Sequence, residues 1–112
     1  MNEDCVFCKI VKGEIPATVV YEDERVLAFE DLNPKMPVHV LVIPKDHYEN
    51  IGDGVSEETL GRVLAAAAEV ARITGIDASG YRIVSNTGED ACQSVHHLHV
   101  HVLGGRRMTT DI

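Results

Sequence analysis

The sequence predicts an α+β fold: an antiparallel meander sheet with one long helix and a short N-terminal helix. Two observations carry this prediction. Residues 56–74 place apolar side chains at helical spacing, whereas the other apolar runs are short and resemble strands. Strands arranged around one helix are typical of an antiparallel α+β sheet. The 112 residues fit one domain, 1–112.

The first half of the chain is expected to hold one helical turn and three strands. The turn lies in the partly apolar segment 5–12 and ends at Gly13, because glycine interrupts regular structure. An acidic turn separates the first two strands, and the third is the strongest β-branched run. These strands are expected at 19–22, 25–30 and 38–43.

The long helix is expected at 56–74. Ser56 suits the N-cap, the two acidic residues after it suit the positive end of the helix dipole, and Gly75 is a natural stop. The middle of the helix, 65–68, is apolar on every side, which favours burial by a partner helix from a second copy. High helix propensity of alanine is the alternative explanation. We therefore expect a homodimer.

The last two strands are expected at 81–85 and 95–103. In the final strand, alternation puts His97, His99 and His101 on one face, roughly 6–7 Å apart, and the apolar residues between them on the other. An imidazole can act as a nucleophile, a proton carrier or a metal ligand near neutral pH. Three on one face predict a functional site.

Three explanations of these histidines compete. They are structural, they form a tri-histidine metal site, or one attacks an electrophile while its neighbours move protons. Gln93 and Ser94 before the strand, Asn86 at the end of the neighbouring strand and His39 on an adjacent one favour the third. Such donors suit an anionic phosphoryl centre, and they are less needed where a metal supplies the charge.

Composition limits the partners. Ten basic and eighteen acidic residues give a net charge of −8 without a basic stripe, which argues against nucleic-acid binding, although a small anionic ligand is compatible. No apolar run reaches transmembrane length and the N-terminus does not resemble a secretory signal, so we expect a cytoplasmic protein that binds no membrane. The pair Cys5 and Cys8 is a redox pair, half of a zinc site or merely packed together.

Residues 93–106 resemble the signature of the histidine-triad (HIT) nucleotide-binding family, in which three histidines alternate with apolar residues. Three further blocks, 27–31, 37–45 and 85–86, resemble the other blocks of that family in the same order. The Gly-Gly-Arg ending is similar to the Hint branch and differs from the diadenosine-polyphosphate hydrolases. The resemblance therefore covers most of the chain and implies a HIT-like fold.

The resemblance implies a hydrolase that cleaves purine nucleoside phosphoramidates, or related nucleotides, through a nucleotidyl-histidine intermediate. His99 would be the nucleophile, and His101, His39 and Ser94 would assist it at the phosphate. Asp31 would bind the ribose, and Phe29 and Leu32 the base. The implied nucleotide-binding residues are Phe29, Asp31, Leu32, Asn86, Gln93, Ser94, His99 and His101. A nucleotide-binding or scaffolding protein with incidental hydrolysis, or a tri-histidine metal hydrolase, are the alternatives.

Bacterial members of the family often carry one structural zinc, and the resemblance implies the same ligands here: Cys5, Cys8, His47 and His97. One departure stands out. Cys92 occupies a position where the family usually has glycine, which is expected to narrow the approach to the phosphate or to force an unusual backbone angle, because glycine alone visits positive φ freely.

Overall fold

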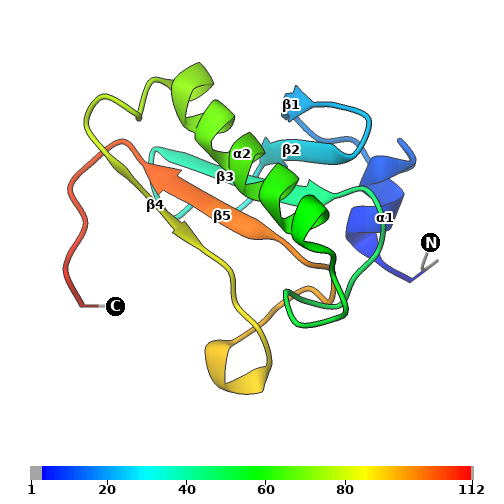
Figure 1. Ribbon diagram of the computed structural model, residues 1–112. Helices are drawn as coiled ribbons and strands as arrows, with labels where there is room; N and C mark the ends of the chain where they lie inside the picture. Colours follow the sequence, from blue (N-terminus) through cyan, green and yellow to red (C-terminus); the bar gives the residue numbers. More distant parts are fainter. Residues whose placement is uncertain (1–3, 112) are drawn as a thin grey trace.

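The computed structural model describes residues 4–111 and confirms the α+β class. Five antiparallel strands form one sheet in the order β1-β2-β3-β5-β4. Helix α2 lies across one face of the sheet, and α1 lies near the N-terminus at the right of the view (Figure 1). The elements are α1 (Val6–Val11), β1 (Val19–Glu22), β2 (Val26–Glu30), β3 (Val38–Pro44), α2 (Glu57–Thr74), β4 (Tyr81–Val84), the 3-10 helix η1 (Glu89–Ala91) and β5 (Val100–Gly104).

The ends of α2 follow from its capping residues. The Ser56 hydroxyl accepts a hydrogen bond from the Thr59 amide at 3.1 Å, and Gly75 ends the helix at a φ of 80°. The buried face consists of small residues, which lets the helix approach the sheet closely: Val63, Ala66, Ala67, Val70 and Ala71. Within residues 4–111, no helix has the length and apolar character needed to span a membrane.

Alternation along the strands gives the sheet two different faces. Val40 and Val42 of β3 and Val102 of β5 pack with α2 in one core. Leu41 and Ile43 of β3 join a second cluster with the side chains of α1. Because successive side chains of a strand point to opposite faces, His39 of β3 and His101 of β5 lie on the face that α1 covers. Phe7 of α1 also packs against the rings of His97 and His99.

The last strand is shorter than predicted. The expected strand 95–103 begins only at Val100 in β5, since β3 pairs Val42 with Val100 and then ends at Pro44. Two residues further on, Leu98 would lie opposite Pro44, which has no backbone N–H to continue the ladder. The Leu98 amide instead donates to the Tyr48 carbonyl at 2.6 Å. The segment that carries the first histidines is therefore fixed by a loop.

The glycines after the triad serve close packing. A Cβ atom at Gly104 would lie 2.8 Å from Ile76 Cδ1, and one at Gly105 would lie 2.8 Å from Pro37 Cβ. Gly105 also has a φ of 102°, which disfavours any other residue. The pair lets the end of α2 and the loop before β3 both close onto the end of β5.

Gly104→Ala should lower the free energy of unfolding by about 1–3 kcal/mol, because the added methyl group overpacks Ile76. Gly61→Ala is the matched control: no atom lies within 4 Å of its added Cβ, so removing a helical glycine should raise that free energy by about 0.5–1 kcal/mol. Urea denaturation of both variants measures the difference. Equal stability of the two proteins would contradict this account.

Candidate active site and metal centre

A cavity of about 280 Å³ opens beside the histidines, between α1, the end of β2 and the segment before β5. Its walls are mostly apolar, and Leu32, at 92% exposure, stands at its margin. Phe7 of α1 packs edge-on against Phe29 and His99, with ring centroids 5.4 and 5.3 Å away. The predicted site residues that line the cavity are Phe29, Asp31, Leu32, Ser94, His99 and His101.

His99 is held in one protonation form by a main-chain carbonyl. Its Nδ1 lies 2.7 Å from the His97 carbonyl oxygen, which can only accept, so Nδ1 carries the proton. In the neutral ring, Nε2 then keeps its lone pair. The hydroxyl of Ser85, the residue after β4, donates to the His99 carbonyl at 2.9 Å and holds the main chain of the same residue. The ring that lines the cavity therefore offers an unprotonated nitrogen.

The protonation of His39 and His101 follows from another main-chain group. The Lys35 amide donates to His39 Nδ1 at 3.0 Å, so the neutral His39 ring carries its proton on Nε2. That N–H faces His101 Nδ1 at 2.9 Å, which makes Nδ1 of His101 the acceptor and puts the His101 proton on Nε2. His101 thus presents an N–H donor, whereas the neighbouring His99 offers an unprotonated nitrogen.

Asp31, His39 and His101 have donor atoms close enough to suggest a metal site. The Asp31 carboxylate lies 3.4 Å from His39 Nε2. However, a metal on that nitrogen would move the His39 proton to Nδ1, where it would face the Lys35 N–H. This donor-to-donor clash argues against a metal hydrolase built on these residues. A tri-histidine metal site is also disfavoured because His97 belongs to a different cluster.

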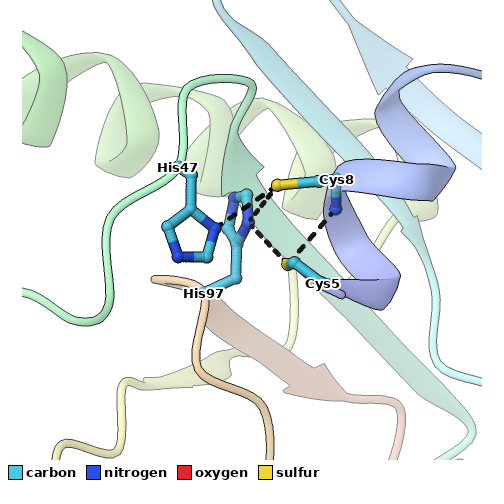
Figure 2. Close-up of side chains that lie close together, drawn as sticks. All are labelled: Cys5, Cys8, His47 and His97. Carbon is cyan, nitrogen blue, oxygen red and sulfur yellow. Dashed lines mark hydrogen bonds between the residues drawn. The ribbon is translucent and has the colours of Figure 1, made fainter. Parts of the chain in front are cut away.

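His97 belongs to a second cluster, with Cys5, Cys8 and His47, whose ligand atoms all lie within 4.8 Å of one another. Figure 2 shows both cysteines reaching from the start of α1 toward the two rings. The distance from sulfur to Nδ1 is 3.3 Å for Cys5 and His97, 3.3 Å for Cys8 and His47, and 3.6 Å for Cys8 and His97. A tetrahedral zinc ion with ordinary bond lengths separates sulfur and nitrogen ligands by about 3.5 Å.

The outer nitrogens of both rings also suit a metal centre. His97 Nε2 donates to the Pro44 carbonyl at 2.9 Å, which leaves the Nδ1 lone pair directed at the sulfurs. His47 Nε2 is buried without a hydrogen-bond partner among the described residues, and the Glu49 carboxylate is 3.9 Å from it. Burial lowers the pKa of His97 to about 4, so its ring is neutral at physiological pH, as a metal ligand must be. Burial also raises the pKa of the Cys5 thiol, an effect that a bound cation would counteract. The donors therefore fit a closed Cys2His2 site.

Comparison with protein families identifies the family to which the chain belongs. A family model described as the HIT domain matches residues 12–108. The chain belongs to the HIT family. The recognition based on the histidine signature, and the HIT-like fold that it implied, are confirmed.

Individual HIT relatives extend over nearly the whole chain. A maize "14 kDa zinc-binding protein" is 52% identical over 92% of this chain and 83% of its own. The "Purine nucleoside phosphoramidase" of Escherichia coli is 42% identical over 95% of this chain and 91% of its own. A solved HIT family hydrolase from Clostridium thermocellum superposes with a TM-score of 0.95 at 49% identity, covering 100% of this chain and 99% of that one.

Two predicted nucleotide-binding residues of this HIT protein do not line the cavity. Asn86 is half-buried just beyond β4. Gln93 directs its side-chain amide to main-chain groups of neighbouring loops. Sequence reasoning assigned no role to Phe7, Ser85 or Glu49, although Phe7 stands between the two cysteines and Ser85 belongs to a block that resembles the family.

Cys92, where the family resemblance led us to expect a glycine, adopts a left-handed backbone conformation with φ 59° and ψ 42°. It has the only positive φ among the non-glycine residues of 4–111. The expected unusual backbone angle is therefore present, and the loop keeps the conformation that glycine would adopt. The side chain of Cys92 is exposed and does not line the cavity.

Burial keeps His39 and His101 uncharged. Desolvation, with smaller contributions from His99 and His39, lowers the pKa of His101 to about 4. Desolvation also lowers the pKa of His39, although Asp31 opposes it. Both rings are therefore neutral at physiological pH, as the hydrogen-bond directions require.

The proton-linked stability of His101 is testable. The unfolded ring takes up a proton near its ordinary pKa of 6.5, but the folded ring does not until about 4, so stability should fall as the pH drops through this window. Histidine NMR titration should give a pKa near 4 for His101. Denaturation at about pH 7 and about pH 5 should show a smaller stability loss in His101→Asn than in the wild type. A His101 pKa at or above 6.5 would contradict this.

Proposed function

We propose that this protein is a nucleoside phosphoramidase that forms a nucleotidyl intermediate on His99. The observation that carries the proposal is the hydrogen bond from His99 Nδ1 to the His97 carbonyl, which leaves Nε2 unprotonated at a cavity wall. A neutral imidazole nitrogen is a nucleophile near pH 7, and its phosphorus adduct is labile. The similarity to a protein named purine nucleoside phosphoramidase supports this substrate class.

In this proposal two balanced steps cleave the substrate. His99 Nε2 attacks the α-phosphorus as the phosphorus–nitrogen bond breaks, and the amine leaves with a proton that the Ser94 hydroxyl relays from solvent. Water then attacks phosphorus, displaces His99 and releases a proton to solvent, giving a nucleoside monophosphate. The Nε2–H of His101 donates to a phosphoryl oxygen, and His39 keeps that proton in place through its bond to Nδ1.

The cavity explains how the nucleoside would bind. Its apolar wall, with Phe29 and Leu32, suits a purine base. One oxygen of Asp31 accepts from the Asn33 amide at 2.8 Å, which orients the carboxylate at the margin of the cavity. The other oxygen lies 3.4 Å from His39 Nε2 and, as a carboxylate oxygen, keeps a second lone pair for ribose hydroxyls. The proposed ligand is therefore a purine nucleoside monophosphate or its phosphoramidate.

His99→Ala should abolish hydrolysis of an adenosine phosphoramidate, because no other side chain offers the attacking nitrogen. AMP affinity should change by no more than a few-fold, since the remaining cavity persists. His96→Ala, with a side chain 70% exposed, is the matched control and should retain the wild-type rate. Turnover by His99→Ala at the wild-type rate would rule out this mechanism.

The same cavity also suits a nucleotide-binding or scaffolding protein in which hydrolysis is incidental. The fixed tautomers of His99 and His101 favour an enzyme, because a binding site alone does not need an unprotonated nitrogen beside a donor. AMP binding by the wild type without turnover of phosphoramidate would support the scaffolding alternative.

We propose further that Cys5, Cys8, His47 and His97 hold one structural zinc ion. The sulfur–nitrogen distances and the lone-pair directions described above support it, as does the name of the maize relative. A closed four-ligand zinc has no open position for a substrate, so its chemistry is to join elements. Here it would join α1, which forms one wall of the cavity, to the segment that leads to His99.

Purified protein should contain about one zinc per chain by elemental analysis. Cys8→Ser should lose most of this zinc and melt at a lower temperature, because α1 is too short to persist without a tertiary contact. Cys92→Ser, at the exposed cysteine, is the control and should keep its zinc. A metal-free wild type, purified without chelator, would overturn the assignment.

We also propose a homodimer that uses α2. Leu64 and Ile73 of this helix are half exposed, and Tyr81 and Ile83 are exposed on the edge strand β4. Ile83 lies opposite Val102, which packs in the core with α2, so the exposed apolar side chains of β4 lie on the face of the sheet that α2 covers. Large apolar side chains on a helix and an unpaired strand edge favour association.

A further inference from the structure

The side chain of Gln93 joins three segments of the chain. Its Nε2 donates to the Glu49 carbonyl at 2.7 Å and to the Val95 carbonyl at 3.0 Å. Its Oε1 accepts from the Gly88 amide at 2.9 Å, and its own backbone amide donates to the Gly88 carbonyl at 3.1 Å. Two carbonyls require the nitrogen and one N–H requires the oxygen, so only one orientation of the amide satisfies all three bonds.

These bonds leave Gln93 unable to serve a phosphate. A side-chain amide has two N–H donors, and both are already used on carbonyl groups of the protein. The one free position on the amide is a lone pair on Oε1. A phosphate oxygen is itself an acceptor, so it cannot form a hydrogen bond with this lone pair. Gln93 is also absent from the residues that line the cavity.

The bonds of Gln93 tie the chain on either side of Ser94 to a third loop. Gly88 begins the η1 loop, Glu49 lies in the loop that follows β3, and Val95 leads toward the triad. Ser94 lines the cavity but is exposed and lies outside any strand. Its position therefore depends on its neighbour, because exposed loop residues without a hydrogen-bonded ladder are the most mobile parts of a fold.

We propose that Gln93 is a positioning residue that holds Ser94 against the phosphate and the leaving group without touching the nucleotide. The proposal rests on the proposed function of Ser94 in proton delivery. It replaces the direct nucleotide contact that the family resemblance implied for Gln93. The loop of Glu49 is its fixed support, since this loop also accepts the Leu98 amide and follows His47 of the metal cluster.

Two variants test the role of the amide in kinetics. Gln93→Ala removes all three side-chain bonds, whereas Gln93→Glu keeps an acceptor for Gly88 but turns both donors into acceptors facing carbonyl oxygens. Both should lower kcat for an adenosine phosphoramidate by about ten-fold or more, with the Kd for AMP changed less than about three-fold. Asp90→Ala, an exposed change in the same loop, is the control and should match the wild type.

A double-mutant cycle tests whether the effect passes through Ser94. If Gln93 acts by holding that hydroxyl, Gln93→Ala should cost little further kcat once Ser94→Ala is present. Fully additive losses would overturn the proposal. An AMP affinity lowered about ten-fold with kcat unchanged would also overturn it, because that result identifies a direct ligand contact.

Hydrogen–deuterium exchange tests the positioning without any reaction. In Gln93→Ala the amides of 86–96 and 47–53 should exchange faster, whereas those of β2 and β3 should keep wild-type protection. Unchanged exchange in both loops would refute the proposal even if kcat falls. If wild type proves inactive on phosphoramidates, the proposed function fails on its own, and the exchange result still decides whether Gln93 holds the loop.

Discussion

The pairing of β3 with β5 at the centre of the sheet is the constraint on which the molecule depends. Its register brings Leu41 opposite His101 and sets His39 within hydrogen-bond distance of His101. The same register sends the valines of both strands to the opposite face, where α2 covers them. One ladder thus builds the core and the reactive face together, and the ladder stops where Pro44 supplies no donor.

Main-chain groups, rather than charged side chains, determine the chemistry of the histidines. The Lys35 amide, the His97 carbonyl and the Pro44 carbonyl each have a single hydrogen-bonding role, so each fixes the proton of one ring. The site needs no buried charge for this, and burial then keeps the rings neutral. His97 takes part in both halves, as a metal-cluster member through its ring and as a support of His99 through its carbonyl.

Periodicity in the sequence was sufficient to predict the sheet, α2 and the common face of the histidines, because burial imposes a period of 2 or 3.6 on side chains. Periodicity could not predict that β5 starts at Val100, because the start of this strand depends on which residues of β3 lie opposite it. Six of the site residues that the family resemblance implied, including Ser94 and Asp31, line the cavity. The interactions of Gln93 escaped prediction because they join main-chain groups of distant loops, which leave no trace in side-chain patterns.

The glycine that follows β5 has a consequence for the reactive face. Gly105 lets Pro37 come so close that a Cβ atom would not fit between them. Pro37 lies between Lys35, whose amide selects the His39 tautomer, and His39 itself. A methyl group at residue 105 would therefore push Pro37 and the loop that carries Lys35 away from β5. The amide that sets the tautomer of His39, and through it the proton of His101, would move with that loop, although the methyl group adds no charge.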